Sequence, residues 1–483
     1  MNKIFKEAEK LVKGNYKFFT TPGHKQGESY NDFDLNNLLK YDLTEVPGLD
    51  NVHHPTECIE DSLNNLSYFY GSKKSYYLFN GSTSGIQTMI FTAFKEYDEI
   101  LIERGCHKSI MDAVYLRKLK VNFINREIYN LDLLLPDNLL KIDYSEKNIT
   151  LNNIKYNLEL NPKIKGVVLT NPNYYGLYID QKEIYDYLKS KVIYLLIDSA
   201  HGAHIRAFNK NIECPNANCD ISVMSAHKTL ATFTQGAYLH INNEKLLKKA
   251  NEYFSIFTST SPSYLTMISL EKSLNDCFEK QIEGKKLISK CNEVRNFISE
   301  NTCLIGMENS QIRHKTNGNF GFDDTRICLK FKFEYINSEK LYRFLFDQKI
   351  ICEMSYFNGI LLIPSVYTKI EDFDYLMENI KKFRYKLEDR NVFKSILKFY
   401  QIPYKKIYEP YELENREYKL IRIEDGFNNV LFNNIFLYPP GSPLIFKGEK
   451  ILKEHIDLIL EYRKLGYKIN GIIDNKYLKV VEE

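Results

Sequence analysis

Short apolar runs alternate with amphipathic stretches between residues 75 and 240, and this alternation predicts an α/β fold. Each run is rich in Val, Ile, Leu or Tyr, which is typical of a strand buried on both faces of a sheet. The runs are SYYLF (75–79), DEILIE (98–103), IKGVVLT (164–170), VIYLLID (192–198) and DISVMS (220–225).

The segment IQTMIFTAFKEY (86–97) carries apolar side chains at helical spacing, so we predict a crossover helix there. Helices between consecutive buried strands favour parallel pairing. We therefore predict an open, mainly parallel, doubly wound sheet that binds its ligand at the C-terminal ends of the strands. The apolar face of the helix comprises Ile86, Met89, Ile90, Ala93 and Phe94.

The pattern changes after about residue 243, which indicates further domains. A long helical segment near 264–300 precedes a second set of strands and helices between 326 and 383, and a tail follows residue 390. We divide the chain into an N-terminal arm (1–40), a large domain (41–300), a small α/β domain (301–390) and a C-terminal domain (391–483).

Composition excludes several classes of protein. The 483 residues include 65 Lys and Arg and 62 Asp and Glu, and a net charge of +3 argues against a nucleic-acid partner. Nine Cys without any CxxC pair argue against a disulfide framework and favour reduced thiols. No apolar stretch reaches the ~18 residues of a membrane span, and the N-terminus lacks the apolar core of a signal peptide. We expect a cytoplasmic protein that binds neither membrane nor metal.

Three segments that follow predicted strands carry candidate chemistry. The small residues of NGSTSG (80–85) open a helix, where free N–H groups and the hydroxyls of Ser82 and Thr83 suit a phosphate. Asp198 ends one strand, and Ser225, His227 and Lys228 follow the next. Taken singly, each has an ordinary alternative: a capped turn, a salt-bridged carboxylate, a solvated lysine.

The order of these segments predicts one cofactor. Pyridoxal phosphate requires a cup for its phosphate, a carboxylate for its pyridine nitrogen and a lysine for its aldehyde. Lys228 lies 228 − 198 = 30 residues after Asp198, and both follow buried strands. A lysine desolvated at such a strand end has a lowered pKa and becomes a nucleophile.

At this point the sequence resembles the Orn/Lys/Arg decarboxylase family of fold-type-I pyridoxal phosphate enzymes, in particular its shorter, Bacillus-type arginine decarboxylase branch. Ser199 departs from the family pattern, which has an acidic residue there. The matching segments are TPGHKQG, DLTEVPGLDNVHHP, FNGSTSGIQ, RGCHKS, NPNYYGLYID, DSAHGAH, SAHKTLATFTQGAYLH, TSPSYL and YPPGSP.

The resemblance implies a role for each matching residue. Lys228 would carry the cofactor, Asp198 would pair with the pyridine nitrogen and His107 would stack on the ring. Ala200 would pack on the other ring face, with His201 near the phenolic oxygen. The phosphate would be held by Ser82, Thr83, Ser225 and His227, and by a hydroxyl from the TSPSY segment (Thr260, Ser261, Ser263) of a neighbouring subunit. The large domain would then bind the cofactor, and the active site would lie at the interface of a homodimer or larger homo-oligomer.

The resemblance also implies a reaction. We expect decarboxylation of a basic amino acid, with arginine giving agmatine and carbon dioxide for polyamine and spermidine biosynthesis, and with lysine and ornithine as alternatives. The distal cation of such a substrate needs an acidic partner, and Glu353 and Glu57 are candidates.

Two other activities stay open at this stage. The same cofactor site serves other fold-type-I reactions, such as transamination. A zinc hydrolase would use His201, His204 and Cys106 or His107, although no carboxylate base stands at HExxH spacing.

Overall fold

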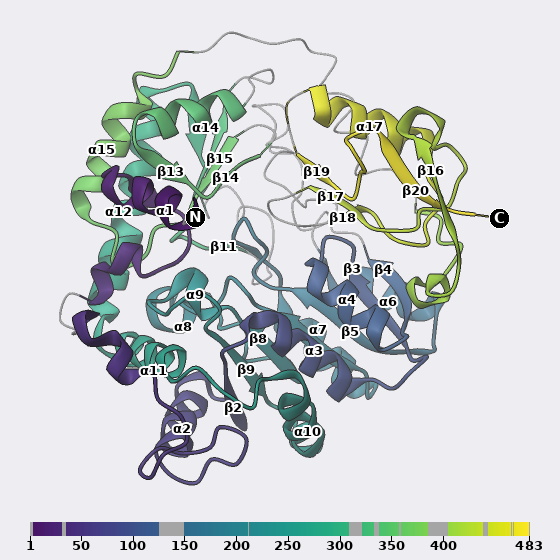
Figure 1. The fold of residues 1–483 in the computed structure, drawn as a ribbon, viewed down its shortest axis with the longest axis horizontal. Coiled ribbons are helices and arrows are strands. Elements are labelled where there is room, and N and C mark those ends of the chain that lie inside the picture. Colours follow the sequence, from purple (N-terminus) through teal and green to yellow (C-terminus); the bar gives the residue numbers. More distant parts are fainter. Residues whose placement is uncertain are drawn as a thin grey trace.

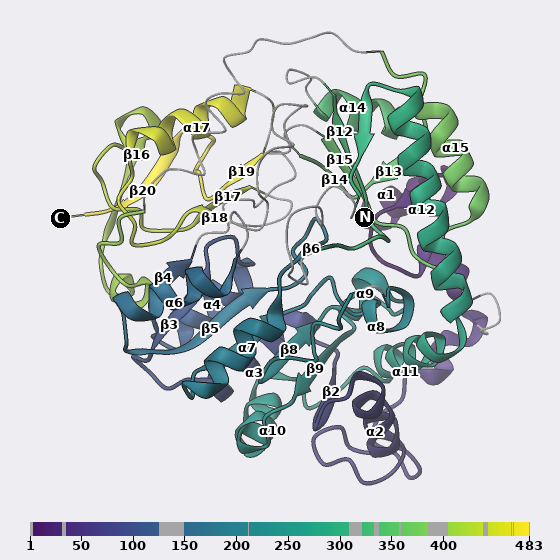
Figure 2. The same ribbon diagram turned by 180° about the vertical axis from the view of Figure 1, so that it is seen from behind.

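The computed structural model describes residues 3–30, 35–124, 149–210, 212–308, 321–332, 338–356, 359–384, 404–437, 443–464, 466 and 468–482. Figures 1 and 2 show three lobes in these residues, with the lower lobe built on the largest sheet. Every helix in these ranges is too short or too polar to span a bilayer.

The sheet of the lower lobe confirms the predicted fold class. Its order is β2-β9-β8-β7-β5-β3-β4, and β9 is antiparallel to both neighbours while the other pairs are parallel. Strands β4 and β9 were not predicted from the sequence. The seven strands are β2 (Lys74–Leu78), β3 (Glu99–Glu103), β4 (Lys120–Ile124), β5 (Ile164–Thr170), β7 (Tyr194–Asp198), β8 (Ile221–Met224) and β9 (Ala237–Ile241).

Successive side chains of a strand point to opposite faces of the sheet, and here both sets are apolar. Helices therefore cover both faces. Leu101, Leu195 and Ile197 pack with α6 (Leu151–Leu160) and α7 (Gln181–Ser190). Ile100, Ile102 and Leu196 belong to a second, larger core. The helices that contribute to this second core are α2 (Cys58–Tyr70), α3 (Gly81–Ala93), α4 (Lys108–Leu116), α10 (Leu247–Phe257) and α11 (Tyr264–Glu279).

Helix α3 is the predicted crossover helix, but it begins at Gly81 rather than Ile86 and ends at Ala93. Gly81 has a φ of 80°, which lets the chain turn directly from β2 into the helix. At Gly85 a Cβ atom would lie 2.4 Å from the Leu78 side chain, so glycine permits the close approach of helix and sheet. The first turn of α3 is thereby held at the end of β2.

The second lobe contains an antiparallel sheet of order β10-β12-β15-β14. The long helical segment expected near 264–300 is two helices that meet at Lys280, α11 and α12 (Gln281–Asn301). The other elements are α1 (Lys3–Lys13), β1 (Lys17–Phe19), β10 (Leu304–Gly306), β12 (Ile327–Phe331), α14 (Ser338–Asp347), β13 (Ile350–Cys352), β14 (Met354–Tyr356), β15 (Gly359–Leu362) and α15 (Ile370–Ile380).

The N-terminal arm and α12 both pack onto this second lobe. Strand β1 pairs in parallel with β13, and Phe19 shares a core with Cys291 and Val294 of α12 and with Leu329 of β12. The predicted boundaries at residues 40 and 300 stay predictions. The pairing of β6 (Leu177–Tyr178) with β11 (Gly321–Phe322) joins two segments that are distant in the sequence. The remaining short elements are η1 (Lys25–Tyr30), η2 (Leu35–Tyr41), α8 (Ile205–Phe208), α9 (Ala226–Thr229) and η4 (Glu244–Leu246).

The third lobe, yellow in Figure 1, has its own apolar core that runs from Ile423 to Val480. Its sheets are β16-β20 and β18-β17-β19. The YPPGSP motif lies outside the described residues except for Pro443. The elements are η5 (Pro410–Leu413), β16 (Tyr418–Arg422), η6 (Ile423–Asp425), β17 (Ile435–Leu437), β18 (Pro443–Ile445), α17 (Lys453–Lys464), β19 (Ile469–Asn470) and β20 (Tyr477–Val481).

Candidate active site

The predicted chemical groups meet at one edge of the large sheet. Strands β7 and β8 are parallel neighbours, so Asp198 at the end of β7 and Ser225 after β8 reach the same edge. The first turn of α3 joins them, because Ser225 Oγ donates a hydrogen bond to Ser82 Oγ at 2.8 Å. The expectation that a ligand site lies at the C-terminal strand ends therefore has a structural basis.

The N-terminus of α3 has the features of an anion cup. The Asn80 side chain does not cap the helix, and its Oδ1 instead accepts the Ser259 N–H at 3.1 Å. The first N–H groups of an α-helix have no intrahelical partner, and the helix dipole favours negative charge there. Ser82 is half-buried and Thr83 is exposed, so the hydroxyl of Thr83 is open to solvent. This end of α3 suits a phosphate group.

Lys228 lies in the one-turn helix α9, and its Nζ stands 3.1 Å from His201 Nε2. Burial lowers the pKa of Lys228, although the negative charges of Asp198 and Glu353 oppose the shift. A lowered pKa increases the fraction of neutral amine, which is the nucleophilic form.

Asp198 is buried, and burial raises its pKa while the charge of Lys228 and a hydrogen bond from Ala200 oppose the shift. Among the described residues its carboxylate accepts a single hydrogen bond, from the Ala200 N–H at 3.1 Å. A buried carboxylate with so few donors is stabilised by a further cationic N–H, such as a protonated pyridine nitrogen.

His107 caps α4, and its Nδ1 accepts the Ser109 N–H at 3.2 Å. Desolvation and the charge of Lys228 lower the His107 pKa to about 4, so the ring is neutral near pH 7. His107 is solvent-accessible, and its electrostatic neighbours include Lys228 and His201. A neutral, accessible aromatic ring beside Lys228 can stack on a planar cofactor.

His227 and Ser261 fit their predicted roles less directly. The Nδ1–H of His227 donates to the Gly236 carbonyl at 3.0 Å, and burial lowers its pKa to about 4. Its neutral Nε2 is then an acceptor, so a bond to phosphate requires protonation of the ring. Ser261 is exposed, and its N–H donates to Ser259 Oγ at 3.1 Å. Phosphate binding by both residues stays a prediction, as do the roles of Thr260 and Ser263.

The polar groups present fit pyridoxal phosphate. The α3 cup suits its phosphate, Asp198 suits its ring nitrogen, and the amine of Lys228 suits its aldehyde. In addition, Ser199 Oγ and Thr229 Oγ1 are buried without hydrogen-bond partners in the described part of the chain, beside Asp198 and Lys228 respectively. Ala200, which is half-buried, follows them at the same strand end.

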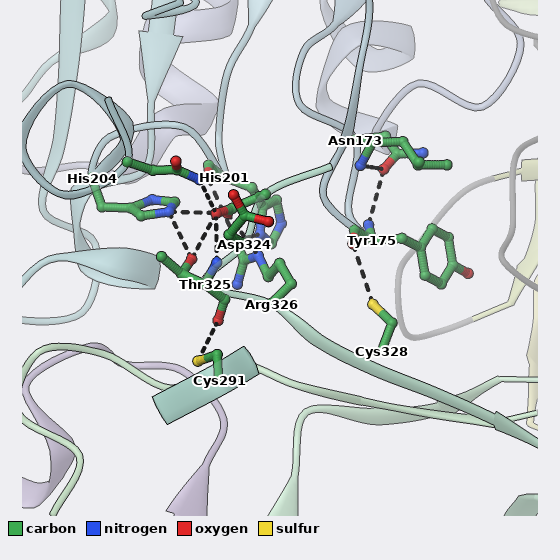
Figure 3. A network of polar contacts seen from close by, with 12 residues as sticks. Asn173, Tyr175, His201, His204, Cys291, Asp324, Thr325, Arg326 and Cys328 are labelled. Carbon is green, nitrogen blue, oxygen red and sulfur yellow. Dashed lines mark hydrogen bonds and ion pairs between the residues drawn. The ribbon is translucent and has the colours of Figure 1, made fainter. Parts of the chain in front are cut away.

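The structure adds residues that sequence reasoning did not identify. Tyr174 places its ring 5.9 Å from Lys228 Nζ and 4.6 Å from the His201 ring. The Arg326 guanidinium, one residue before β12, lies 3.1 Å from His201 Nδ1 (Figure 3). The charged cluster DDTR ahead of an apolar strand was the available signal for Arg326, and NPNYYGLYID contained Tyr174.

The two candidate carboxylates for a distal cation lie in different surroundings. Glu353 accepts hydrogen bonds from Thr20 Oγ1 at 2.6 Å, from the Thr21 N–H at 2.9 Å and from the Tyr174 hydroxyl. Despite its burial, these donors and Arg326 keep the pKa of Glu353 below its usual value. Glu57 is exposed at the start of α2, and its N–H donates to Asp50. Only Glu353 is linked to the Lys228 surroundings by these described contacts.

The residues suggested for zinc have other partners. His201 faces Lys228 and Arg326, whereas His204 Nε2 contacts Thr325 Oγ1 and Asp323 Oδ2, each at 2.9 Å. Burial raises the pKa of the Cys106 thiol, which disfavours a thiolate ligand. Within the described ranges, no group of three His, Cys, Asp or Glu could hold a metal ion.

Comparisons with known proteins agree with this geometry. The family described as Orn/Lys/Arg decarboxylase, major domain, matches residues 3–332. The uncharacterized protein YaaO of Bacillus subtilis (strain 168) is 29% identical over 99% of this chain and 98% of its own length. An arginine decarboxylase of Bacillus anthracis is 26% identical over 96% and 94%. The Francisella novicida lysine decarboxylase LdcF has the same fold, with a TM-score of 0.77 and 20% identity over 96% of this chain and 78% of that chain.

The family match covers well over half of the chain, and the fold agrees with it. The residues at the strand ends fit the cofactor of that family, as shown above. The chain therefore belongs to the Orn/Lys/Arg decarboxylase family, and it is a pyridoxal-phosphate-dependent amino-acid decarboxylase, a carboxy-lyase.

Proposed function

We propose that this decarboxylase acts on arginine, releasing agmatine and carbon dioxide. The observation that carries a basic substrate is Glu353, a half-buried carboxylate whose pKa is held low and whose charge acts on Lys228 and His227. Relatives named arginine decarboxylase match 96% of the chain at 26% identity. A relative named lysine decarboxylase LdcA matches 55% of it at 25% identity, which keeps lysine as the second candidate.

Bound cofactor supplies a conjugated ring that accepts the electron pair of the bond between Cα and the carboxylate. The chain's own residues prepare that chemistry. Asp198 holds a proton at the ring nitrogen through its buried negative charge. The α3 cup, with Ser82 and Thr83, fixes the phosphate and so the orientation of the ring. His107 would stack on one face of the ring, and Ala200 would pack on the other.

Lys228 would hold the cofactor through its amine, and the substrate amine would compete for the same position. Its Nζ stands 3.1 Å from His201 Nε2, so His201 orients the amine of Lys228. Tyr174 connects this pair to Glu353, because its ring lies beside both Lys228 and His201 while its hydroxyl donates to the carboxylate.

We propose further that the enzyme is a homodimer or larger homo-oligomer with its site at the interface. The TSPSY segment supports this, since Thr260 and Ser261 are exposed and their hydroxyls are available to a second copy. We also propose a cytoplasmic enzyme that supplies polyamine and spermidine biosynthesis. Light scattering should give at least twice the mass of the chain, and a monomer that stays fully active would contradict the shared site.

The test of substrate is carbon dioxide release from purified, cofactor-loaded protein offered arginine, lysine or ornithine separately. We expect kcat/KM for arginine to exceed that for lysine by at least about 10-fold, or about 1.4 kcal/mol. A preference for lysine or ornithine would refute arginine and keep the reaction. Keto-acid formation without carbon dioxide release would indicate transamination, the more distant alternative.

A further inference from the structure

A continuous set of polar side chains connects Lys228 to the second lobe, and Figure 3 shows three of its members, His201, His204 and Arg326. His201 Nε2 lies 3.1 Å from Lys228 Nζ, and His201 Nδ1 lies 3.1 Å from Arg326 Nη2. Arg326 Nε in turn lies 3.5 Å from Asp323 Oδ2, which also lies 2.9 Å from His204 Nε2. His201 is therefore held between two nitrogen groups, one from each side of its ring.

Arg326 determines which nitrogen of His201 carries the proton. A guanidinium group has five N–H donors, no acceptor, and does not deprotonate in proteins. His201 Nδ1 must therefore accept from Arg326 Nη2, and in a neutral imidazole the proton then resides on Nε2. If both nitrogens of His201 were protonated, the Nδ1–H would point at an N–H of Arg326, and neither group could accept. Burial, Lys228 and Arg326 also hold the pKa of His201 well below its usual value.

The same reasoning extends to Lys228. A lysine ammonium has three donors and no acceptor, so it cannot accept a hydrogen bond from an Nε2–H. A contact of 3.1 Å between Lys228 Nζ and a protonated Nε2 is satisfied only when Nζ offers its lone pair. The neutral amine is also the form that attacks an aldehyde.

We propose that Arg326 is a positioning residue that fixes His201 as the Nε2–H tautomer and thereby holds Lys228 as the free amine that captures the cofactor. Asp323 supports Arg326 by compensating its charge within the buried set. This inference rests on the role of Lys228 proposed above, and it concerns the location of protons in the cofactor-free chain.

Charged groups on several elements act on this arrangement. Asp198 at the end of β7 and Glu353 between β13 and β14 favour the ammonium form of Lys228, whereas burial and Arg326 oppose it. The Tyr174 ring, 5.9 Å from Nζ, also favours a cation. The remaining groups act on His201: His107 from α4 and His204 from α8 both disfavour its protonation.

Asp323 is suited to its supporting role. It is buried, yet the His204 and Arg326 beside it hold its pKa well below the usual range, so it remains a carboxylate. The Thr325 hydroxyl and N–H donate to its other oxygen at 2.8 and 3.1 Å. In the described part of the chain, Arg326 Nε and Nη1 have no hydrogen-bond partner, and Nη2 contacts His201 Nδ1 at 3.1 Å and the His201 carbonyl at 3.5 Å. Asp323 therefore acts on Arg326 through its charge, with its Oδ2 3.5 Å from Nε.

Three substitutions distinguish the effect of the N–H donor of Arg326 from the effect of its positive charge. Arg326→Lys keeps both, Arg326→Gln keeps an N–H donor without the charge, and Arg326→Met removes both. Cofactor-free protein labelled with ¹⁵N-histidine gives the tautomer from long-range ¹H–¹⁵N spectra, with His201 assigned by its loss in His201→Gln. We expect the Nε2–H form in wild type and in the Lys and Gln variants, and a gain of the Nδ1–H form in the Met variant.

The second readout is the rate at which pyridoxal phosphate recombines with the cofactor-free protein as a function of pH. We expect the midpoint of this profile to rise by about one pH unit in Arg326→Met, equivalent to one lost hydrogen bond. Arg326→Lys should restore the wild-type midpoint. A role in packing alone would lower stability without changing the tautomer or the midpoint.

An Nδ1–H tautomer in wild type would overturn the proposal by itself, even if no variant folded. The same tautomer and midpoint in all four proteins would also overturn it. Neither readout depends on substrate, so a failure of the arginine assignment would leave this result standing. Recombination at another lysine would instead contradict the site on which the inference rests.

Discussion

Two arginines, Arg104 and Arg326, show how differently this fold treats a buried cation. Arg104 follows β3 and makes a two-pronged ion pair with Glu449, at 2.5 and 2.8 Å. Three aromatic rings, of Phe123, Tyr404 and Phe446, lie within 5.1 to 5.3 Å of its guanidinium carbon. Arg326 Nε lies 3.5 Å from the Asp323 carboxylate, and Arg326 Nη2 lies 3.1 Å from His201 Nδ1.

The comparison distinguishes an ion pair that stabilises the fold from charged groups that belong to the candidate active site. The Arg104 pair joins the large sheet to the third lobe with its charge fully matched in geometry, which is the arrangement expected where nothing has to change during a reaction. Around Lys228, Asp198 accepts a single hydrogen bond, and Arg326 Nε and Nη1 have no hydrogen-bond partner in the described part of the chain. Buried charged groups with few partners and shifted pKa values are typical of active sites, which agrees with the position of the candidate site at these strand ends.

The largest effect is expected at Lys228. Lys228→Ala removes the amine that captures the cofactor, so carbon dioxide release should fall by at least about 10⁴-fold. Lys228→Arg is the matched control, because it keeps a cation but has no free amine, and it should be equally inactive. Carbon dioxide release retained in either variant would contradict the assignment of Lys228.

Two aspartates of the same sheet give the next comparison: Asp198 lies at the C-terminal end of β7, and Asp220 lies just before the N-terminal end of β8. Asp198→Asn removes the charge that keeps the ring nitrogen protonated, and kcat should fall by roughly 10³-fold. Asp220, before β8, accepts the Leu195 N–H and the Asn243 amide, each at 2.8 Å. Asp220→Asn should lower stability and leave kcat per folded molecule within about threefold. Equal losses of kcat in both variants would contradict the claim that Asp198 acts in the reaction and that Asp220 only stabilises the fold.

Much of this site was predictable from the sequence, because its parts are local. The cup, Asp198 and Lys228 each follow a buried strand, and parallel strands bring their ends together. Arg326 was not predicted, because its contact with His201 depends on how the second lobe packs on the first. Tyr174 lies in a recognised motif after β5, but its contact with His201 after β7 depends on the paths of two loops that the sequence does not fix. The same holds for β9: the motif TQGAYLH was recognised, but antiparallel insertion between β2 and β8 is a matter of tertiary pairing.

The Arg104 pair should matter for stability rather than for chemistry. Arg104→Met leaves Glu449 buried without its partner, so the free energy of unfolding should fall by about 3 to 5 kcal/mol. Glu449→Gln should give a similar loss, and the double variant less than the sum, because the two share one interaction. Urea unfolding measures these values, and additive losses would contradict a direct pair.

The two candidate carboxylates predict a smaller, selective effect. Glu353→Gln should raise KM for arginine by about 10-fold, or about 1.4 kcal/mol, because a half-buried charge opposite the substrate's cation is lost. Glu57→Gln, at an exposed position, should change KM by less than about twofold. A larger effect at Glu57 would move the distal-cation site from the β13–β14 turn to the start of α2.

Acid should destabilise the protein through buried histidines. Burial lowers the pKa of His240 to about 3 and of His455 to about 4, against 6.5 for an exposed histidine. Between pH 6.5 and about 4 the unfolded chain binds more protons, so stability falls as pH falls through this window. At 1.36 kcal/mol per pKa unit, His455 contributes at most about 3 kcal/mol, and His240, whose window extends to about pH 3, at most about 5 kcal/mol.

The pH dependence of stability also tests the Arg104 region. The charge of Arg104 adds to the effect of burial on His455, so both Arg104→Met and His455→Asn should flatten the pH profile of unfolding below pH 6.5. Unfolding measured at pH 7.5, 6 and 5 gives the slope. An unchanged slope in His455→Asn would show that His455 does not take up a proton on unfolding.

The central claim is that the groups at the strand ends form the cofactor site, and the most direct test is chemical. Cofactor-loaded protein is reduced with borohydride, which fixes the cofactor to the lysine that carries it, and the digested peptides are sequenced by mass spectrometry. The account predicts the label on Lys228, in the peptide that contains SAHKTL. A label on any other lysine would contradict it.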